Sequence, residues 1–201
     1  MKLLAFTDIH GYSTALGRIG QKVKTQNPDL LVCAGDITLF ERKISFILRK
    51  LNKLNKKIIM VHGNHEDSST IIKYLRLFKN IIFIHKNYFI ENNILFLGYG
   101  GGGFALVDKE FEKIVKLKFN SIIKNNKDKK IVLVTHAPPY KTRLDNIAGN
   151  HCGNKSIRNF FEKNKIDLLI CGHLHENFGK EDKIGKTKII NPGPFGKIIS
   201  I

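Results

Sequence analysis

Short apolar runs alternate with amphipathic stretches along most of the chain, and this alternation constrains the fold more than any other feature. Short apolar runs bounded by turn residues predict buried strands, whereas apolar residues spaced three and four apart predict helices. A strand, a helix and a second strand in succession form a βαβ unit, which builds a parallel sheet covered by helices. The sequence therefore favours a layered α/β architecture.

The expected elements lie close together along the chain. We expect strands at Lys2–Thr7, Asp29–Cys33, Lys57–Val61, Ile81–Ile84, Lys130–Thr135 and Asp167–Cys171, and helices at Thr14–Thr25, Glu41–Asn55, Ser69–Phe78, Lys109–Asn125 and Lys155–Lys163. The apolar runs Tyr88–Glu91 and Ile94–Leu97, separated by Asn92 and Asn93, predict a hairpin, and the tail Phe178–Ile201 predicts short β segments. Parallel units mixed with hairpins predict more than one sheet.

The length and apolar content of the chain are those of a single compact domain. It has 201 residues, of which 42% are hydrophobic, and no linker or internal repeat divides it, so we expect one domain over residues 1–201. No apolar stretch approaches the roughly 20 residues that cross a bilayer. The N-terminus lacks a small-residue cleavage site and predicts a first strand instead of a signal peptide. We therefore expect no membrane partner.

Cysteine usage and charge bear on compartment and partners. Cys33, Cys152 and Cys171 are odd in number and lack C-x-x-C spacing, which favours reduced thiols and a cytoplasmic location. A formal charge of +17 would attract phosphates or nucleic acid. The basic residues are mostly Lys, however, and Arg is the better bidentate phosphate ligand. The charge therefore favours a solvated lysine surface over a dedicated polyanion site.

Polar side chains follow five of the expected strands, at the point where each strand ends. These segments are Asp8-Ile9-His10, Gly35-Asp36, Gly63-Asn64-His65, His136 and Gly172-His173-Leu174-His175. Ligands of open α/β sheets bind at the carboxyl ends of strands, so the five segments are expected to converge. Residues i and i+2 of an extended backbone project to the same side, which would pair Asp8 with His10. Carboxylate, amide and imidazole groups suit Mn²⁺, Fe²⁺ or Zn²⁺ better than Ca²⁺.

In their order these segments resemble the motif set of the calcineurin-like metallophosphoesterase superfamily, which is D-x-H, G-D, G-N-H-[ED], a lone H and G-H-x-H. The resemblance implies a four-layer α/β/β/α sandwich of two mixed sheets flanked by helices. It also implies a dinuclear centre of two divalent ions, with Mn²⁺ expected and Fe, Zn or Ni as alternatives. By motif, one ion would be held by Asp8, His10 and His175, the other by Asn64, His136 and His173, and Asp36 would bridge them.

The resemblance further implies hydrolysis of a phosphomonoester or phosphodiester by attack of a metal-bridging hydroxide. His65 directly follows Asn64, so on extended backbone it would point away from the ligand direction and toward substrate. The resemblance makes His65 the group that protonates the leaving oxygen or stabilises the phosphoryl charge. The Asp and Arg that follow the G-D motif of protein phosphatases are missing after Asp36, which argues against a phosphoprotein substrate. Glu66 and Asp67 are candidates for orienting His65.

Two other segments are candidates for contacts near the site. The loop from Tyr140 to Gly153 carries Arg143 and His151, which we expect to overhang the metals and bind substrate. The glycine run Gly100–Gly103 predicts a loop that needs positive φ angles or close backbone approach. His62 and His85 are interpreted as structural residues near a strand end and a hairpin.

Three functions compete on these grounds. The first is a hydrolase of a small phosphoester or nucleotide. The second is a nuclease, because DNA-repair nucleases of the superfamily share the motifs and the basic charge would help to bind a polyanion; however, no basic stretch is interleaved with aromatic residues that would stack bases. The third is a non-catalytic binding scaffold, which should lack a ligand or the histidine of G-N-H. The natural substrate and the preference for monoester or diester stay open.

Overall fold

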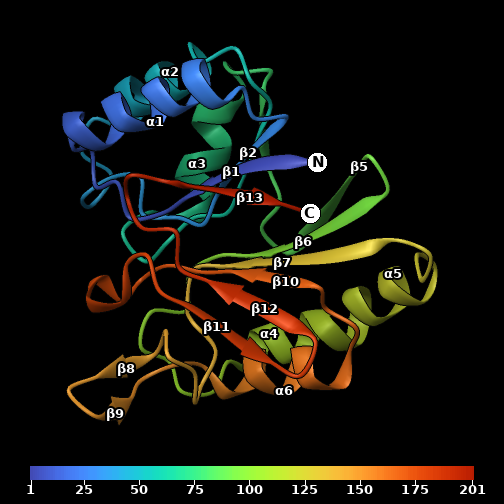
Figure 1. The fold of residues 1–201 in the computed structure, drawn as a ribbon. Coiled ribbons are helices and arrows are strands. Elements are labelled where there is room, and N and C mark those ends of the chain that lie inside the picture. The colour runs from blue at the N-terminus through green and yellow to red at the C-terminus, as the bar shows by residue number, and fades with distance from the viewer.

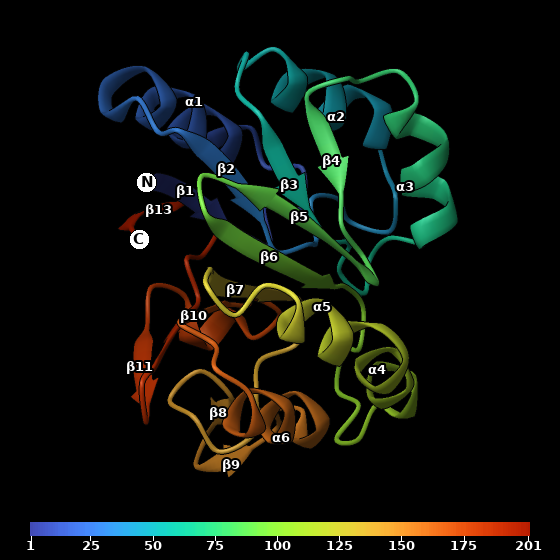
Figure 2. The same ribbon diagram turned by 90° about the vertical axis from the view of Figure 1, so that its right-hand side faces the viewer.

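The computed structural model describes residues 1–201 and has four layers, with two sheets packed face to face between two groups of helices (Figures 1 and 2). The first sheet contains, in order, β13 (Lys197–Ser200), β1 (Lys2–Phe6), β2 (Leu30–Cys33), β3 (Ile58–Met60) and β4 (Ile81–Phe83). The second contains β11 (Glu181–Ile184), β12 (Thr187–Ile190), β10 (Leu168–Ile170), β7 (Lys130–Thr135), β6 (Ile94–Tyr99) and β5 (Asn87–Glu91).

Both sheets are mixed. In the first, β1 to β4 are parallel and only the edge strand β13 is antiparallel. In the second, the central strands are parallel and the edge strands β5 and β11 are antiparallel. Helices α1 (Ser13–Gln26), α2 (Ile44–Asn52) and α3 (Ser68–Leu75) cover the outer face of the first sheet, and α4 (Lys109–Ile114), α5 (Asn120–Lys124) and α6 (Lys155–Lys163) cover that of the second (Figures 1 and 2). The four-layer α/β/β/α prediction is confirmed.

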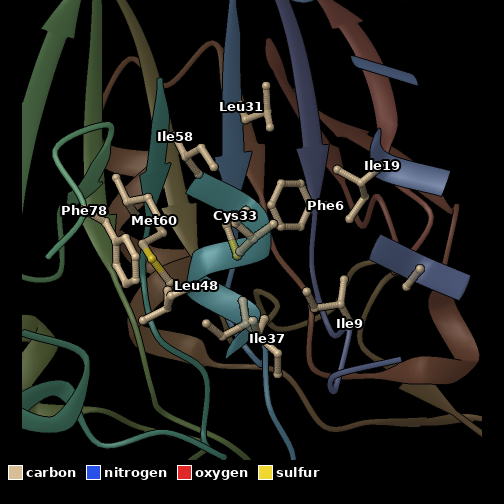
Figure 3. Close-up of a cluster of buried hydrophobic side chains, with 14 of the residues drawn as sticks. Phe6, Ile9, Ile19, Leu31, Cys33, Ile37, Leu48, Ile58, Met60 and Phe78 are labelled. Atoms are coloured by element: carbon tan, nitrogen blue, oxygen red, sulfur yellow. The ribbon is translucent and has the colours of Figure 1, made fainter. Parts of the chain in front are cut away.

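Three apolar cores hold the layers together, and the side-chain alternation of the strands explains how. In β2, Leu30 and Val32 point into the core between the sheets, whereas Leu31 and Cys33 point toward the helices. The helix-side core of the first sheet surrounds Phe6 and Met60 and is shown in Figure 3. Because both strand faces are buried, the strands read as continuous apolar runs in the sequence.

The strand register brings the ends of different strands to one edge. Phe6 pairs with Cys33 and Cys33 with Met60, so β1, β2 and β3 end side by side. Backbone hydrogen bonds extend this alignment beyond the strands: the Asp8 N–H donates to the Gly35 carbonyl at 3.0 Å, and the Gly172 N–H donates to that of His136 at 2.9 Å. The loops that carry the polar motifs are therefore fixed to each other before any side chain is considered.

The structure differs from the sequence prediction at several element boundaries. Helix α2 begins at Ile44 instead of Glu41. The predicted helix Lys109–Asn125 is helical from Lys109 to Lys124 but contains a π-helical segment, Val115–Phe119; Phe119 and Phe111 are both buried, with their rings 6.4 Å apart. A two-stranded hairpin, β8 (Asn146–Ile147) and β9 (Asn150–His151), lies in the stretch expected to be loop. No helix has the length and apolar character needed to span a membrane.

Candidate metal centre

The Asp36 carboxylate lies at the middle of a group of imidazoles that come from separate loops. Its Oδ2 atom is 3.4 Å from Nε2 of His136 and 3.8 Å from Nε2 of both His10 and His65. Asp8 stands beside it, with Oδ1 at 3.6 Å from Nε2 of His175 and 3.9 Å from Nε2 of His10. Both carboxylates are almost fully buried. All five predicted segments thus meet at the predicted edge of the sheets.

Two of these imidazoles are oriented from behind by backbone carbonyls. His10 places Nδ1 at 3.0 Å from the Thr38 carbonyl, and His136 places Nδ1 at 2.8 Å from the Ala34 carbonyl. A carbonyl only accepts, so Nδ1 carries the proton in each ring. Nε2 of each ring is therefore directed toward the carboxylates, and in the neutral form of the ring its lone pair is free to bind a cation. This is the arrangement by which outer hydrogen bonds orient metal-binding histidines.

The motif residues reach the site on turns, not on extended backbone. Asp8, His10, Asp36 and His173 have φ angles of 52°, 43°, 50° and 72°, all in the left-handed region. The expectation that extended i and i+2 residues pair through strand geometry is therefore wrong, because β1 already ends at Phe6. The pairs still converge. A non-glycine residue with positive φ is uncommon, and such residues concentrate at functional sites.

Two glycines of the motifs leave room for the carboxylates. A Cβ on Gly63 would lie 1.8 Å from Oδ1 of Asp36, and a Cβ on Gly172 would lie 2.4 Å from Oδ2 of Asp8. No side chain fits at either position while the carboxylates stay in place. The Asp8 carboxylate is also held by the Thr7 hydroxyl at 2.6 Å and by the His173 N–H. Thr7 belongs to none of the sequence motifs, so the sequence alone does not identify it as part of the site.

A second group of ligand-type atoms lies on the other side of Asp36. The Asn64 Oδ1 atom is 3.0 Å from Nε2 of His136, and the rings of His136 and His173 are 5.2 Å apart. Nε2 of His173 is buried and has no hydrogen-bond partner. Burying an imidazole nitrogen without a partner costs free energy unless something binds it. The predicted second ligand set of Asn64, His136 and His173 is thus brought together.

His65 faces the carboxylate cluster instead of pointing away from it. The backbone N–H of His65 donates to Oδ1 of Asp36 at 3.0 Å. The His65 ring lies 4.9 Å from the ring of His10 and 4.4 Å from that of Phe40. Nδ1 of His65 is buried without a partner. The divergence of Asn64 and His65 expected for an extended backbone is therefore not observed.

The hydrogen bonds of Glu66 and Asp67 go to groups other than the His65 ring. Glu66 is buried and accepts hydrogen bonds from the Thr38 N–H and hydroxyl and from the Gly63 N–H, so it ties the loop after β2 to the loop after β3. Asp67 instead accepts from the Ser69 N–H and caps α3. His65 is therefore oriented by the hydrogen bond from its backbone N–H to Asp36 and by packing of its ring against His10 and Phe40.

Burial and charge shift the pKa values of the site in opposite directions. Burial lowers the pKa of His10, and burial together with the charge of His136 lowers that of His173 to about 4. Burial acts in the same direction on His136, but the hydrogen bond and charge of Asp36 outweigh it and raise the His136 pKa. Burial would raise the pKa of Asp36, yet His136 and the His65 N–H lower it. Asp36 and His136 therefore form an ion pair in the metal-free chain.

The donor atoms fit a pair of divalent cations. Three sets of three donors each lie within 4.8 Å of one another: Asp8, His10 and His175; His10, Asp36 and His65; and Asp8, Asp36 and His136. The set contains oxygen and imidazole nitrogen and no thiolate, which suits borderline divalent ions. Nε2 of His10 lies 3.1 Å from Nε2 of His175, so two nitrogens are aimed at one point. A cation at that point would satisfy both.

The predicted substrate contacts Arg143 and His151 line a cavity of their own. Arg143 and His151 line one polar cavity of about 420 Å³ with Lys141, Lys180 and Asp182, and no cluster residue lines it. His151 is held there by Asp145, with Nδ1 at 2.7 Å from Oδ1. The structure brings Arg143 and His151 to one cavity, and none of the cluster residues lines that cavity. Their contact with substrate stays a prediction.

Comparisons with known proteins agree with this arrangement. The sequence model of the family described as calcineurin-like phosphoesterase matches residues 1–177. The uncharacterized protein MJ1162 of Methanocaldococcus jannaschii is 35% identical over 96% of this chain and 88% of its own length.

Two solved structures show the same fold at low sequence identity. The protein TT1561 of Thermus thermophilus is similar with a TM-score of 0.75 at 17% identity, over 96% of this chain and 89% of that one. A dimetal phosphatase from Danio rerio is similar with a TM-score of 0.68 at 12% identity, over 94% and 86%. The family implies a dinuclear divalent metal centre, and the cluster around Asp36 supplies groups that could form it. The chain belongs to the calcineurin-like phosphoesterase family and is a hydrolase of phosphoric ester bonds.

Proposed function

We propose that this chain hydrolyses a small phosphomonoester or phosphodiester at a dinuclear centre built around Asp36. The observation that carries the proposal is the position of Oδ2 of Asp36, which lies within 4 Å of imidazole nitrogens from three separate loops. A buried carboxylate in contact with several imidazoles is an arrangement that favours cation binding.

The two ligand groups suggest how the ions would be shared. Asp8, His10 and His175 would hold one ion, as their mutual distances support. Asn64, His136 and His173 would hold the other, and Asp36 would bridge. We propose Mn²⁺ for both positions, with Fe, Zn or Ni as the alternatives that the mixed oxygen and imidazole donors also suit. The unpaired thiols of Cys33 and Cys171 are buried, which suits a reducing compartment, and we propose a cytoplasmic location for a single domain of residues 1–201.

The protein groups would then position the ester and move a proton. Two bound divalent ions would lower the pKa of a water molecule and neutralise charge on the phosphoryl oxygens. His65 is the proton donor to the leaving oxygen in this proposal, because its Nε2 lies beside Asp36 and its side chain is 19% exposed, which leaves it accessible to substrate. The His65 N–H bond to Asp36 keeps the ring next to the reacting centre.

The test compares p-nitrophenyl phosphate with bis-p-nitrophenyl phosphate, with and without Mn²⁺, for the wild type, His65→Ala and His151→Ala. We expect metal-dependent hydrolysis of at least one ester. We expect His65→Ala to lower kcat by about 10²- to 10⁴-fold, the usual contribution of a general acid, with metal content unchanged. His151→Ala removes a predicted substrate contact outside the cluster, so it should raise KM and leave the metal content unchanged. Hydrolysis of neither ester, or hydrolysis without metal, would contradict the proposal.

A further inference from the structure

Three phenylalanines pack against histidines of the metal centre, and two of them are largely exposed. The ring of Phe40 lies 4.4 Å from that of His65, Phe104 lies 4.5 Å from His173, and Phe178 lies 4.8 Å from His175. Phe40 is 69% exposed and Phe104 is 67% exposed, whereas Phe178 is largely buried. We call Phe40, Phe104 and Phe178 the aromatic rim.

The rim surrounds the centre on separate sides. Phe40 adjoins His65, which contacts His10, and Phe178 adjoins His175. Phe104 adjoins His173 on the side where the His136 ring lies 5.2 Å away. The three rings come from the loop after β2, the loop after β6 and the segment after β10. The organic group of an ester whose phosphate is held at the cluster can therefore lie against one of these rings.

The Phe104 ring is carried by a glycine-rich loop whose first residues are hydrogen-bonded to neighbouring segments. Gly101, Gly102 and Gly103 all have positive φ, and a Cβ on Gly103 would lie 3.8 Å from Cβ of Asn64, so the loop passes directly over the centre. The loop is anchored from below, because the Gly100 N–H donates to Nδ1 of His85 and the Gly101 N–H donates to the carbonyl of His62. The His85 ring and the His62 carbonyl thus fix the start of the glycine run that leads to Phe104.

The backbone of Phe40 has an unfavourable conformation. Its φ angle is 49°, and Glu41 beside it has a φ of 60°, both in a region that bulky side chains avoid. The Glu41 N–H bond to the Thr38 hydroxyl fixes the turn. Backbone held in this region concentrates at functional sites.

We propose that the aromatic rim binds a planar ring on the organic group of the substrate, so that the preferred esters are nucleotides or aryl phosphates. This inference rests on the proposed function and narrows its substrate class. Aromatic faces stack on planar rings in an offset or edge-on geometry, and such stacking tolerates differences between bases. Sugar phosphates without a base would gain nothing from the rim.

The first experiment measures competition against the p-nitrophenyl ester that the enzyme hydrolyses. Adenosine 5′-monophosphate and ribose 5-phosphate present the same 5′ ester and differ only in the base. We expect the nucleotide to compete about 5- to 100-fold more tightly in the wild type, the range of stacking effects. Phe104→Leu and Phe40→Leu keep an apolar side chain but remove the ring, and should reduce this preference without changing competition by ribose 5-phosphate.

A matched control comes from Phe46. It is 53% exposed on α2, and its ring contacts Lys50 instead of a site histidine. Phe46→Leu should leave the preference unchanged. Phenyl phosphate distinguishes the two sources of a planar ring: competition as tight as that of the nucleotide assigns the rim to aryl esters, and weaker competition assigns it to nucleotides.

The second experiment does not depend on turnover. The chain contains no Trp, so Phe104→Trp introduces a single fluorophore at the rim, and Phe46→Trp introduces one at the control position. Adenosine 5′-monophosphate should quench Trp at position 104 and not at position 46, and ribose 5-phosphate should quench neither. Equal competition by both phosphates with no quenching would overturn the rim proposal while hydrolysis of the p-nitrophenyl ester continues. Absence of all hydrolysis would instead remove the proposed function, with the quenching still reporting on the rim.

Discussion

The side chains of Asp36 and His136 lie 3.4 Å apart, from Oδ2 to Nε2, and both are almost completely shielded from solvent. They come from loops that follow strands of different sheets, β2 and β7. Their contact therefore joins the two sheets at the centre. In the metal-free chain the pair is an ion pair, because each partner shifts the pKa of the other toward its charged form. A proton on His136 thus stands where a metal cation is proposed.

Metal uptake should release that proton. His136 must be neutral to bind a cation through Nε2, and its raised pKa keeps it protonated above the ordinary value of 6.5. We expect the apparent affinity for Mn²⁺ to increase by up to about tenfold per pH unit in the range where His136 is protonated. Calorimetric titration in buffers with different ionisation enthalpies measures the number of protons released. A binding enthalpy independent of buffer at neutral pH would contradict this prediction.

Acid should destabilise the metal-free protein as the pH falls below the ordinary histidine pKa. Burial lowers the pKa of His85 to about 3, from the ordinary value of 6.5. Between these two values the unfolded chain binds more protons than the folded one, so the free energy of unfolding falls as the pH falls. The slope per histidine is at most about 1.4 kcal/mol per pH unit.

The matched variant for this prediction is His85→Asn. It keeps an acceptor for the Gly100 N–H but cannot titrate. Denaturant unfolding of the metal-free chain between roughly pH 4 and 7 should show a shallower dependence on pH for the variant than for the wild type. Identical slopes would rule out a contribution from His85.

A methyl group at Gly63 should disable the centre. The Cβ of Gly63→Ala would lie 1.8 Å from Oδ1 of Asp36, so the carboxylate must move. We expect loss of metal binding and a loss of activity of about 100-fold, as for other disturbed metal sites. Gly17→Ala is the control, since a Cβ there meets nothing within 4 Å, and it should stabilise α1 by roughly 0.5–1 kcal/mol. Normal metal content in Gly63→Ala would contradict the geometry.

Glu66 should matter for stability because it connects two loops of the site. Glu66→Gln replaces one carboxylate oxygen with an NH₂ group, which would face either the Gly63 N–H at the Oε2 position or the Thr38 N–H and hydroxyl at the Oε1 position. We expect a loss of about 1–3 kcal/mol in the free energy of unfolding, measured by denaturant titration. Glu110→Gln, which removes the exposed pair with Lys86, should cost less than about 1 kcal/mol. Equal effects of the two variants would refute this role of Glu66.

The sequence predicted the convergence of the site because convergence follows from strand register. Each motif directly follows a strand, and parallel strands that end at one edge bring their following loops together. That argument alone brings Asp8 to Asp36, because both follow strands of one sheet; their contact with His136 also requires the second sheet to pack on the first with its strand ends at the same edge. The local backbone conformation could not be predicted in this way, because the positive φ angles of Asp8 and Asp36 occur in loops that are hydrogen-bonded to segments remote in the sequence.

Contacts made by unremarkable residues could not be predicted. The carbonyls of Ala34 and Thr38 orient two histidines, but every residue has a carbonyl and none gives a sequence signal. The aromatic rim is assembled from Phe40, Phe104 and Phe178, which are too far apart in the chain to form a pattern. The glycine run before Phe104 predicted a loop with positive φ angles or close backbone approach. The sequence did not indicate that this loop lies against Asn64.

The most direct measurement is the stoichiometry of Mn²⁺ bound to chelator-treated protein, compared between the wild type, Asp36→Ala and His175→Ala. If Asp36 bridges two ions, the wild type binds two per chain, Asp36→Ala binds neither tightly, and His175→Ala weakens one site, because His175 contacts only the Asp8 side of the cluster. Phosphoesterase activity should follow the doubly loaded fraction. One ion or none in the wild type, or two ions in Asp36→Ala, would contradict a dinuclear centre built on Asp36.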